Sequence, residues 1–375
     1  MSHLRINYRV FTVFLVVGLV MLATAAAVVV GAGQARLRAS FGDHLADVAS
    51  QTAASVDSYV YRRAIETTIL ASVSDVRREA AQASLAPLDA AAVREFDRVW
   101  QQSRTVPEPL APITRNAASA FLAETGRNDQ TYRELVLADR QGRLAAASGM
   151  TTDYFQGDEE WFTRAFGDGV HGRLNVGGVT WDESANTWAL EISAPVEDPA
   201  GGQLAGVLKA VVDVREMAAA VSAMRLGDTG DAALVTDEGQ IVLGSLQPDA
   251  ETQFFAADLL RERIQGIARQ ESPPRISFGA RAQDGRARLV GVGVTQLRAS
   301  YPHLKWLVAV SQAESDLFAP VRFQLWSLLA LLALMAIAVL GLALWFSLRL
   351  AAPPPDEELH LVRHAAVGTI DGEGV

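Results

Sequence analysis

The chain has 375 residues, of which half are hydrophobic, and its formal net charge is −10 at pH 7. It contains no cysteine, which excludes disulfide bonds, thiol catalysis and thiolate metal sites. It also has no block of Lys or Arg that could neutralise a phosphate backbone, so we expect no nucleic-acid partner. The length is sufficient for two domains.

Two uncharged apolar runs, residues 10–32 and 325–348, account for much of the hydrophobic content. Each is longer than the roughly 20 residues that cross a hydrocarbon core about 30 Å thick. Trp326, Trp345 and Phe346 lie at the ends of the second run, and aromatic rings favour the membrane interface. We therefore predict two transmembrane helices. The alternative for the first run is a cleaved signal peptide, although its apolar core exceeds the roughly 7–15 residues of such peptides.

Arginine residues flank both runs on both sides, so the positive-inside rule gives only a weak orientation. The long central segment decides the orientation, because large domains are translocated regardless of their charge. We place residues 1–9 and 351–375 in the cytoplasm and residues 33–320 outside it, in a two-pass membrane protein. A tail of about 25 residues cannot form a stable core.

Residues 34–82 contain no proline and a single glycine, Gly42, and their apolar residues recur at spacings of three and four. This stripe comprises Phe41, Leu45, Val48, Thr52, Val56 and Tyr59, and it resumes with Ile69, Val73, Val76 and Ala80. The pattern predicts one long amphipathic helix, which is stable only if its stripe is buried. Shorter helices are predicted at residues 90–103 and 115–125, with a proline-rich segment between them.

Two segments repeat one plan, residues 135–148 and residues 233–245. Each has an apolar run, an Asp, a turn Gly and a second short run, which is typical of a β-hairpin. Each is followed later by a strand that leads into a helix, near residue 214 and near residue 313. Between them, residues 187–196 alternate in hydrophobicity with the period of a half-buried strand. The sequence thus predicts two α/β units of similar plan.

Three runs in the first unit are the most distinctive: Asp153-Tyr-Phe-Gln-Gly-Asp-Glu-Glu-Trp-Phe162, Val179-Thr-Trp-Asp-Glu-Ser184 and Gly206-Val-Leu-Lys-Ala-Val-Val-Asp213. With the long helix, the two hairpin-led units and the two apolar runs, they resemble the double Cache domain. This is the PAS-like extracytoplasmic sensor of bacterial chemoreceptors, sensor kinases and diguanylate cyclases. The resemblance covers residues 33–320 and implies an α+β fold. It also implies a membrane-distal unit at about residues 111–215 and a membrane-proximal unit at about residues 225–313.

The resemblance also implies where a small ligand binds. In the amino-acid-binding branch of the family, a Tyr is followed by Arg at +5, Trp at +7 and an aromatic residue at +8, and a later strand supplies an Asp. Tyr154, Trp161, Phe162 and Asp213 match this pattern, and Asp182 lies where a further acidic contact is expected.

The position of the Arg is occupied by Glu159, which would repel the α-carboxylate that a guanidinium binds. We therefore predict a ligand with a cationic amine. It would be bound by the carboxylates of Asp182, Asp213 and Glu159, with cation–π contacts from the nearby rings. The candidate ligand-binding residues are Tyr154, Glu159, Trp161, Phe162, Trp181, Asp182 and Asp213. Uncharged ligands, and carboxylates bound through Lys209 or Arg164, remain open.

Each candidate also has a purely structural interpretation. Trp161 and Phe162 could fill the sheet core, Asp182 could form a turn, and Asp213 could cap a helix. His360 and His364 have a spacing that can hold zinc, but no third ligand is evident. The sequence lacks a phosphate-binding glycine loop, a nucleophile elbow and a metalloprotease helix. We therefore predict no enzyme activity, no cofactor and no metal site.

Two functions remain in competition. The first is a subunit of a transmembrane sensory receptor of a bacterial inner membrane, in which a ligand in the distal unit shifts a conformational equilibrium. Because members of the family usually continue into an output domain after the second span, the short tail implies a separate cytoplasmic or membrane signalling partner, or else an incomplete receptor. In this case we expect a homodimer that packs through the helix at residues 34–82. The alternative is a membrane-anchored extracytoplasmic adaptor that binds another protein and has no small ligand.

Overall fold

The computed structural model describes residues 8–87, 89–182, 187–224, 229–244, 275–281, 285–318 and 322–350. The chain divides into two compact units, one formed by Met1–Arg38 with Phe318–Val375 and the other by Ala39–Leu317. Several predicted features lie outside the described residues. These are the cytoplasmic segment before residue 8, the tail at residues 351–375 with its two histidines, and the turn that follows Asp182.

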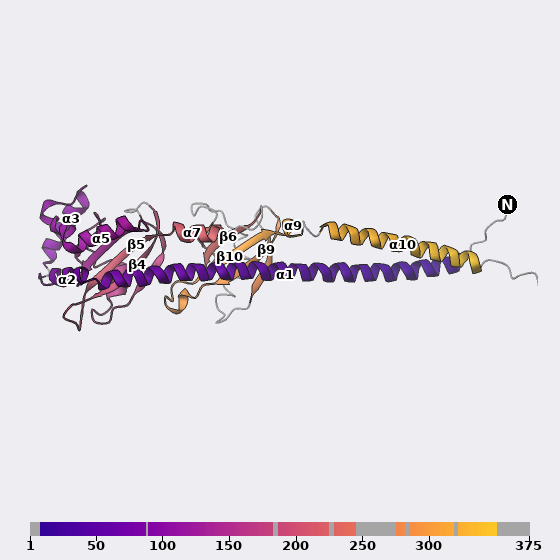
Figure 1. Cartoon of the computed structure of the whole chain (residues 1–375), viewed down its shortest axis with the longest axis horizontal. Coiled ribbons are helices and arrows are strands. Elements are labelled where there is room, and N and C mark those ends of the chain that lie inside the picture. The colour runs from indigo at the N-terminus through magenta and orange to yellow at the C-terminus, as the bar shows by residue number, and fades with distance from the viewer. Residues whose placement is uncertain are drawn as a thin grey trace, which may run out of the picture. The chain divides into compact units, whose positions relative to one another are not determined.

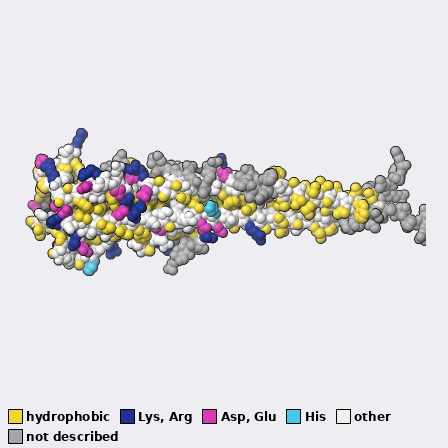
Figure 2. All heavy atoms as spheres, viewed as in Figure 1, with side chains coloured by type: hydrophobic (Ala, Val, Ile, Leu, Met, Phe, Trp, Pro, Cys, Tyr) yellow, Lys and Arg dark blue, Asp and Glu magenta, His cyan; other side chains and the backbone are white. Residues whose placement is uncertain are grey.

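In the first unit, two helices are long and apolar enough to cross a membrane. They are the N-terminal part of α1 (Tyr8–Ser72) and α10 (Arg322–Leu350). On the face shown in Figure 2, the coloured side chains along both helices are mostly hydrophobic. The helices approach closely at Gly18, where an added Cβ would lie 2.6 Å from a methyl carbon of Val339. Small residues at such a crossing let two helix backbones come together.

Helix α1 continues without a break from the first apolar run as far as Ser72. The predicted single helix over residues 34–82 is therefore wrong at its end, because Val73 has an extended backbone (φ −64°, ψ 137°) and a separate helix α2 (Ser74–Ala83) follows. The interruption changes which face is buried. Ile69, which the predicted stripe includes, is 58% exposed, whereas Thr67 and Ala71 are buried.

The first sheet (the N-terminal sheet) has five antiparallel strands in the order β2-β1-β5-β4-β3. The strands are β1 (Tyr132–Asp139), β2 (Leu144–Ala147), β3 (Asn175–Asp182), β4 (Thr187–Glu197) and β5 (Leu204–Asp213). The associated helices are α3 (Ala90–Gln102), η1 (Glu108–Leu110), α4 (Pro112–Arg115), α5 (Ala117–Asn128), α6 (Glu160–Phe166) and α7 (Arg215–Ser222). The predicted helix at residues 115–125 thus begins at Ala117, because Asn116 caps it by accepting the backbone N–H of Ser119.

The second sheet (the C-terminal sheet) has the same strand order, β7-β6-β10-β9-β8. Its strands are β6 (Asp231–Thr236), β7 (Ile241–Gly244), β8 (Ile276–Arg281), β9 (Ala287–Val294) and β10 (Trp306–Ala313). The short helix η2 (Leu297–Ala299) joins β9 to β10, and α9 (Glu314–Leu317) follows β10. The predicted repeat of two hairpin-led units is therefore confirmed.

Helix α1 runs along both sheets and supplies one side of a shared hydrophobic core (Figure 1). Gly291 and Gly293, on one face of β9, allow the closest approach. A Cβ added at Gly291 would lie 2.2 Å from the Leu45 carbonyl carbon, and one added at Gly293 would lie 2.3 Å from the Ala49 carbonyl oxygen. Asp57 strengthens the contact, because its buried carboxylate accepts the backbone N–H of Gln296 at 2.9 Å. The part of α1 from Leu45 to Asp57 is thus held against the C-terminal sheet.

Candidate functional site

A row of side chains on one face of the N-terminal sheet includes three polar residues. In the strand register, Lys209 of β5 lies opposite Val136 of β1 and Ser193 of β4, and Ser193 lies opposite Asn175 of β3. Ser193 and Asn175 are buried, and the Lys209 side chain is only 12% exposed. A lysine in the middle of a buried strand has to find a partner, because an isolated buried charge is costly.

Lys209 finds two partners on this face. Its ammonium nitrogen lies 3.8 Å from a carboxylate oxygen of Glu134 and 5.3 Å from the centre of the Trp161 ring. The Glu134 side chain is only 10% exposed, so water screens this ion pair less than a surface pair. An ion pair beneath an aromatic ring can bind either charge of a small ligand. The ammonium attracts an oxygen acceptor, and the carboxylate attracts an amine.

Helix α6 covers this row with aromatic side chains. Trp161 and Phe162 are both at least 95% buried, and the Ser193 hydroxyl donates to the Trp161 carbonyl at 3.0 Å. The Trp161 indole N–H is buried and has no hydrogen-bond acceptor among the described residues. Buried donors without a partner are uncommon and costly. We call Lys209, Glu134, Trp161, Ser193 and Asn175 the Lys209 cluster.

Acidic side chains adjoin the Lys209 cluster in the segment that leads into α6. Burial raises the pKa of Asp153, and the negative charges of Glu159 and Asp97 raise it further. Hydrogen bonding from Gln156 and the charge of Lys209 oppose this shift. Glu159 itself is exposed at the N-cap of α6. The segment therefore places an excess of negative charge near Lys209, which favours a cation.

The other predicted ligand-binding residues lie in different surroundings. Tyr154 is buried against Val136 and Leu144, makes an edge-to-face contact with Phe96 at 5.8 Å, and lines a cavity at the edge of the sheet. Trp181 is 48% exposed and makes an edge-to-face contact with Trp188 at 5.9 Å. Asp182, the last residue of β3, is partly buried.

Asp213 is buried, and its carboxylate is already engaged by two guanidinium groups. Arg133 and Arg215 donate to it at 2.9 and 2.8 Å, and the backbone N–H of Arg215 donates to its second oxygen. Asp213 lies four positions beyond Lys209 on β5, which is about 13 Å along a strand. The structure thus separates the predicted residues. Trp161 and Phe162 lie at the Lys209 cluster, whereas Trp181, Asp182 and Asp213 lie at the far end of the sheet.

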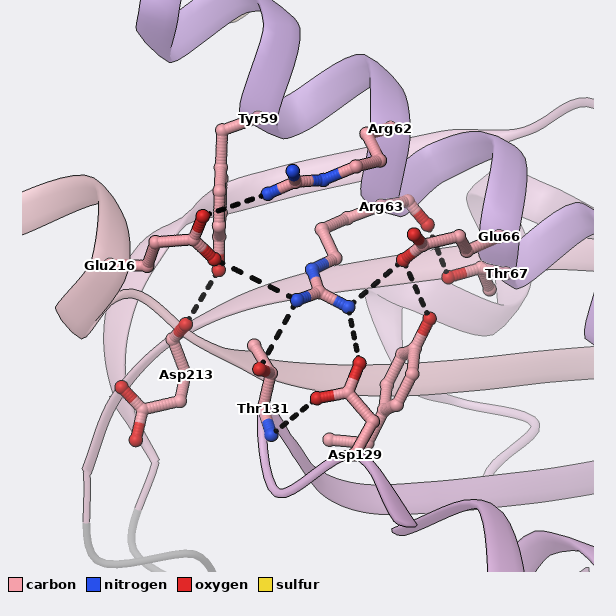
Figure 3. Close-up of polar contacts among 10 residues, drawn as sticks. Tyr59, Arg62, Arg63, Glu66, Thr67, Asp129, Thr131, Asp213 and Glu216 are labelled. Carbon is pink, nitrogen blue, oxygen red and sulfur yellow. Dashed lines mark hydrogen bonds and ion pairs between the residues drawn. The ribbon is translucent and has the colours of Figure 1, made fainter. Parts of the chain in front are cut away.

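The end of β5 is also where the N-terminal sheet meets α1. The Tyr59 hydroxyl donates to the backbone carbonyl of Asp213 at 2.7 Å (Figure 3). Next to it, the buried guanidinium of Arg63 donates to Asp129 at 2.6 Å and to Glu66 at 2.9 Å, and it lies 3.8 Å from Glu216 of α7 (Figure 3). These contacts, which we call the Arg63 cluster, join α1, the α5–β1 turn, β5 and α7.

The sequence prediction did not include Glu134, Ser193, Asn175 or Asp153 among the ligand-binding residues, and it gave Lys209 only as an alternative. A signal was present, because Lys209 interrupts the apolar run of β5 and Glu134 directly precedes that of β1. Among the described residues, no three His, Asp or Glu side chains are close enough together to hold a metal ion. The predicted absence of a metal site stays a prediction.

No protein-family model and no curated protein matches the chain. Solved structures with a similar arrangement include the ligand-binding domain of the Campylobacter jejuni chemoreceptor Tlp3 in complex with 4-methylisoleucine. It has 13% identity and a TM-score of 0.48, over 76% of this chain and 95% of that chain. Another is the ligand-binding domain of the Pseudomonas aeruginosa chemoreceptor PctC in complex with GABA, with 18% identity and a TM-score of 0.46, over 72% of this chain and 100% of that chain.

The ligand-binding domain of the Pseudomonas aeruginosa amino acid chemoreceptor PctB, in complex with L-Arg, also matches. It has 14% identity and a TM-score of 0.46, over 87% of this chain and 99% of that chain. The fold itself follows from the chain's own elements, which are one long helix packed on two five-stranded antiparallel sheets of identical strand order. This is the arrangement that the resemblance to the double Cache domain implies. The predicted α+β fold class is therefore confirmed.

Proposed function

We propose that the chain is a subunit of a transmembrane sensory receptor and that the Lys209 cluster binds its ligand. The observation that carries this proposal is the buried Trp161 indole N–H, which has no acceptor among the described residues. The Lys209 ammonium, which is also a donor, lies 5.3 Å from the centre of the same ring. An oxygen atom of a ligand would satisfy the indole donor and pair with the ammonium. The ordinary cost of an unsatisfied buried donor, about 1–3 kcal/mol, would then become a gain on binding.

The ligand class follows from the charges around the cluster. Glu134 lies 3.8 Å from the Lys209 ammonium, Asp153 interacts with the same charge, and the negative charge of Glu159 acts on Asp153. A small ligand with a cationic amine at one end and an oxygen acceptor at the other matches this distribution. The amine would lie toward Asp153, and the acceptor would lie toward Trp161. The amine of this ligand agrees with the class predicted from the sequence, and the oxygen acceptor is an additional group.

The test uses the full-length chain in lipid nanodiscs and a panel of amines, amino acids and organic acids. A ligand that binds only the folded state raises its stability as RT ln(1 + [L]/Kd), so hits appear as shifts in melting temperature. Binding should be weakened by Trp161→Phe and by Lys209→Met, and Trp181→Phe, at the far end of the sheet, should leave it unchanged. If only organic acids bind, the amine assignment is wrong. If nothing in the panel binds, the alternative function is favoured, in which the chain is a membrane-anchored adaptor without a small ligand.

The same proposal includes a homodimer, because α1 exposes a continuous stripe. Ser55, Ser58, Arg62, Ile65 and Ile69 recur at alternating spacings of three and four and are all exposed. Ile65 and Ile69 are 61% and 58% exposed, which is unusual for two isoleucines on one face of a helix. This spacing is that of a coiled-coil seam. Two copies anchored in one membrane would align their α1 helices in parallel and bring identical residues together.

Cysteine crosslinking tests this dimer without interference, because the chain has no native cysteine. Ile65→Cys and Ile69→Cys should each crosslink to the same residue of a second copy in the membrane. Ala64→Cys is the matched control, since Ala64 is adjacent in sequence but buried against the sheets. Crosslinking at Ala64 that equals crosslinking at Ile65 would exclude the parallel dimer. In the proposed dimer, the signal would pass from the ligand site through α1 and α10 to a separate partner.

A further inference from the structure

A cavity of about 260 Å³ opens beside β2, the edge strand of the N-terminal sheet. It lies between α2, the proline-rich segment that contains η1 and α4, and the β1–β2 hairpin. Its walls combine polar residues with apolar ones, which include Leu110, Pro112 and Ile113. None of its lining residues belongs to the Lys209 cluster, so it is a separate space. It is slightly smaller than the roughly 300–1,000 Å³ of sites for drug-sized ligands.

Three charged side chains line this cavity, and two of them neutralise each other. Arg143 and Asp139 are both buried and form an ion pair at 2.6 Å. The Arg143 guanidinium also donates to the Ala83 carbonyl at 2.7 Å, so it is held in place by the backbone. The third charged residue is Glu79 of α2. The lining therefore carries one negative charge in excess.

Glu79 makes no hydrogen bond and no ion pair with any residue that the structure describes. Its neighbour Arg78 pairs instead with Asp75. Burial raises the pKa of Glu79, and the charge of Arg78 only partly opposes the shift. The carboxylate thus loses hydration without gaining a partner. A cation in the cavity would supply the missing interaction.

Tyr154 completes the cavity with an aromatic ring and a hydroxyl group. Burial raises the pKa of this hydroxyl, so it remains a neutral donor at physiological pH. An aromatic ring and an unpaired carboxylate that line one cavity are groups that bind organic ammonium ions. The apolar wall residues favour a ligand with a short hydrocarbon body.

We propose that this cavity is a second binding site, which takes a small organic ammonium ion. The ammonium group pairs with Glu79 and contacts Tyr154, and the hydrocarbon body contacts the walls formed by η1 and α4. The site does not depend on the Lys209 cluster. It needs no oxygen acceptor on its ligand, which distinguishes it from the ligand proposed above.

The test uses the full-length chain in nanodiscs with n-butylammonium as the probe, and n-butanol and butyrate as its neutral and anionic counterparts. Butylammonium alone should raise the melting temperature, and the rise should saturate with concentration. Glu79→Gln should raise the half-saturating concentration by about tenfold, because it removes a charged hydrogen-bond partner. Glu95→Gln, which removes an exposed carboxylate of α3, should leave this concentration unchanged.

A second variant tests the space rather than the charge. Ala86 lines the cavity and is exposed, so Ala86→Leu should block the cavity without disturbing the core. This variant should also lose the response to butylammonium. The proposal is overturned if butylammonium gives no shift, or if both variants respond as the unmodified chain does. A response that Lys209→Met abolishes and Glu79→Gln preserves would assign the amine to the Lys209 cluster, which overturns this inference and supports the proposed function.

Discussion

Replacing Arg63 with methionine should destabilise the unit that contains the two sheets by about 3 kcal/mol. The Arg63 side chain is 8% exposed and bonds to Asp129 at 2.6 Å and to Glu66 at 2.9 Å. Buried hydrogen bonds between charged groups contribute about 1.5–3 kcal/mol each. The two carboxylates are 40% and 38% exposed, so water can hydrate them once Arg63 is gone, and the loss is smaller than the sum of the two bonds. Methionine preserves much of the apolar packing against the rings of Tyr59 and Tyr132.

Thermal unfolding of the full-length chain in nanodiscs measures the effect. A loss of about 3 kcal/mol corresponds to a fall of about 6–12 °C in melting temperature for a unit of this size. The control is Arg62→Met on the next residue. Arg62 is 51% exposed and forms one ion pair with Glu216, which is 57% exposed, so its loss should cost at most about 1 kcal/mol. Equal falls for the two variants, or a fall of less than about 2 °C for Arg63→Met, would refute the assignment of the Arg63 cluster as a stabilising junction.

Two further predictions concern the contacts of α1. Gly293→Val should lower the free energy of unfolding by about 3 kcal/mol or more, because its Cβ would lie 2.3 Å from the Ala49 carbonyl oxygen. The control is Gly178→Ala, whose new Cβ would have no atom within 4 Å and which should cost less than about 0.5 kcal/mol. Chemical denaturation measures both. Burial raises the pKa of Tyr59 and of Tyr132 to about 12, from 10.0. Between these pH values the folded chain keeps protons that the unfolded chain releases, so stability should be intact below pH 10 and fall above it by about 1.4 kcal/mol per pH unit for each tyrosine. Phenolate absorbance followed with unfolding checks this, and an unchanged slope in Tyr59→Phe would contradict it.

The fold was predictable because its signals are local. Apolar runs without charge, hairpin turns at Gly142 and Gly239, and strands that lead directly into helices are each visible within about 15 residues. The end of the long helix was not predictable in this way. Val73 continues the apolar spacing, but its backbone is extended and α2 packs against the N-terminal sheet. Tertiary contacts outweigh helix propensity at such positions.

The site was less predictable, because its pairings depend on register between distant strands. Tyr154, Trp161 and Phe162 are buried, as bulky aromatic residues near a sheet usually are. The partners of Asp213 are a different case, since Arg133 precedes it by 80 residues and lies on a neighbouring strand. Knowing that β1 pairs with β5, and in which register, is necessary to see that the Asp213 carboxylate already has two cationic partners. A single sequence does not contain that information.

Asp213 explains how the proposed ligand site could act on the long helix. Its backbone carbonyl accepts the Tyr59 hydroxyl of α1, and its carboxylate holds Arg215 at the start of α7. Lys209 lies on the same strand and the same face. A ligand that draws Lys209 toward itself would therefore pull on a strand whose end is bonded to both helices. It can shift the balance between two arrangements of α1 only by as much as its affinities for them differ. The Arg63 cluster joins the same elements beside Asp213 and forms part of that connection.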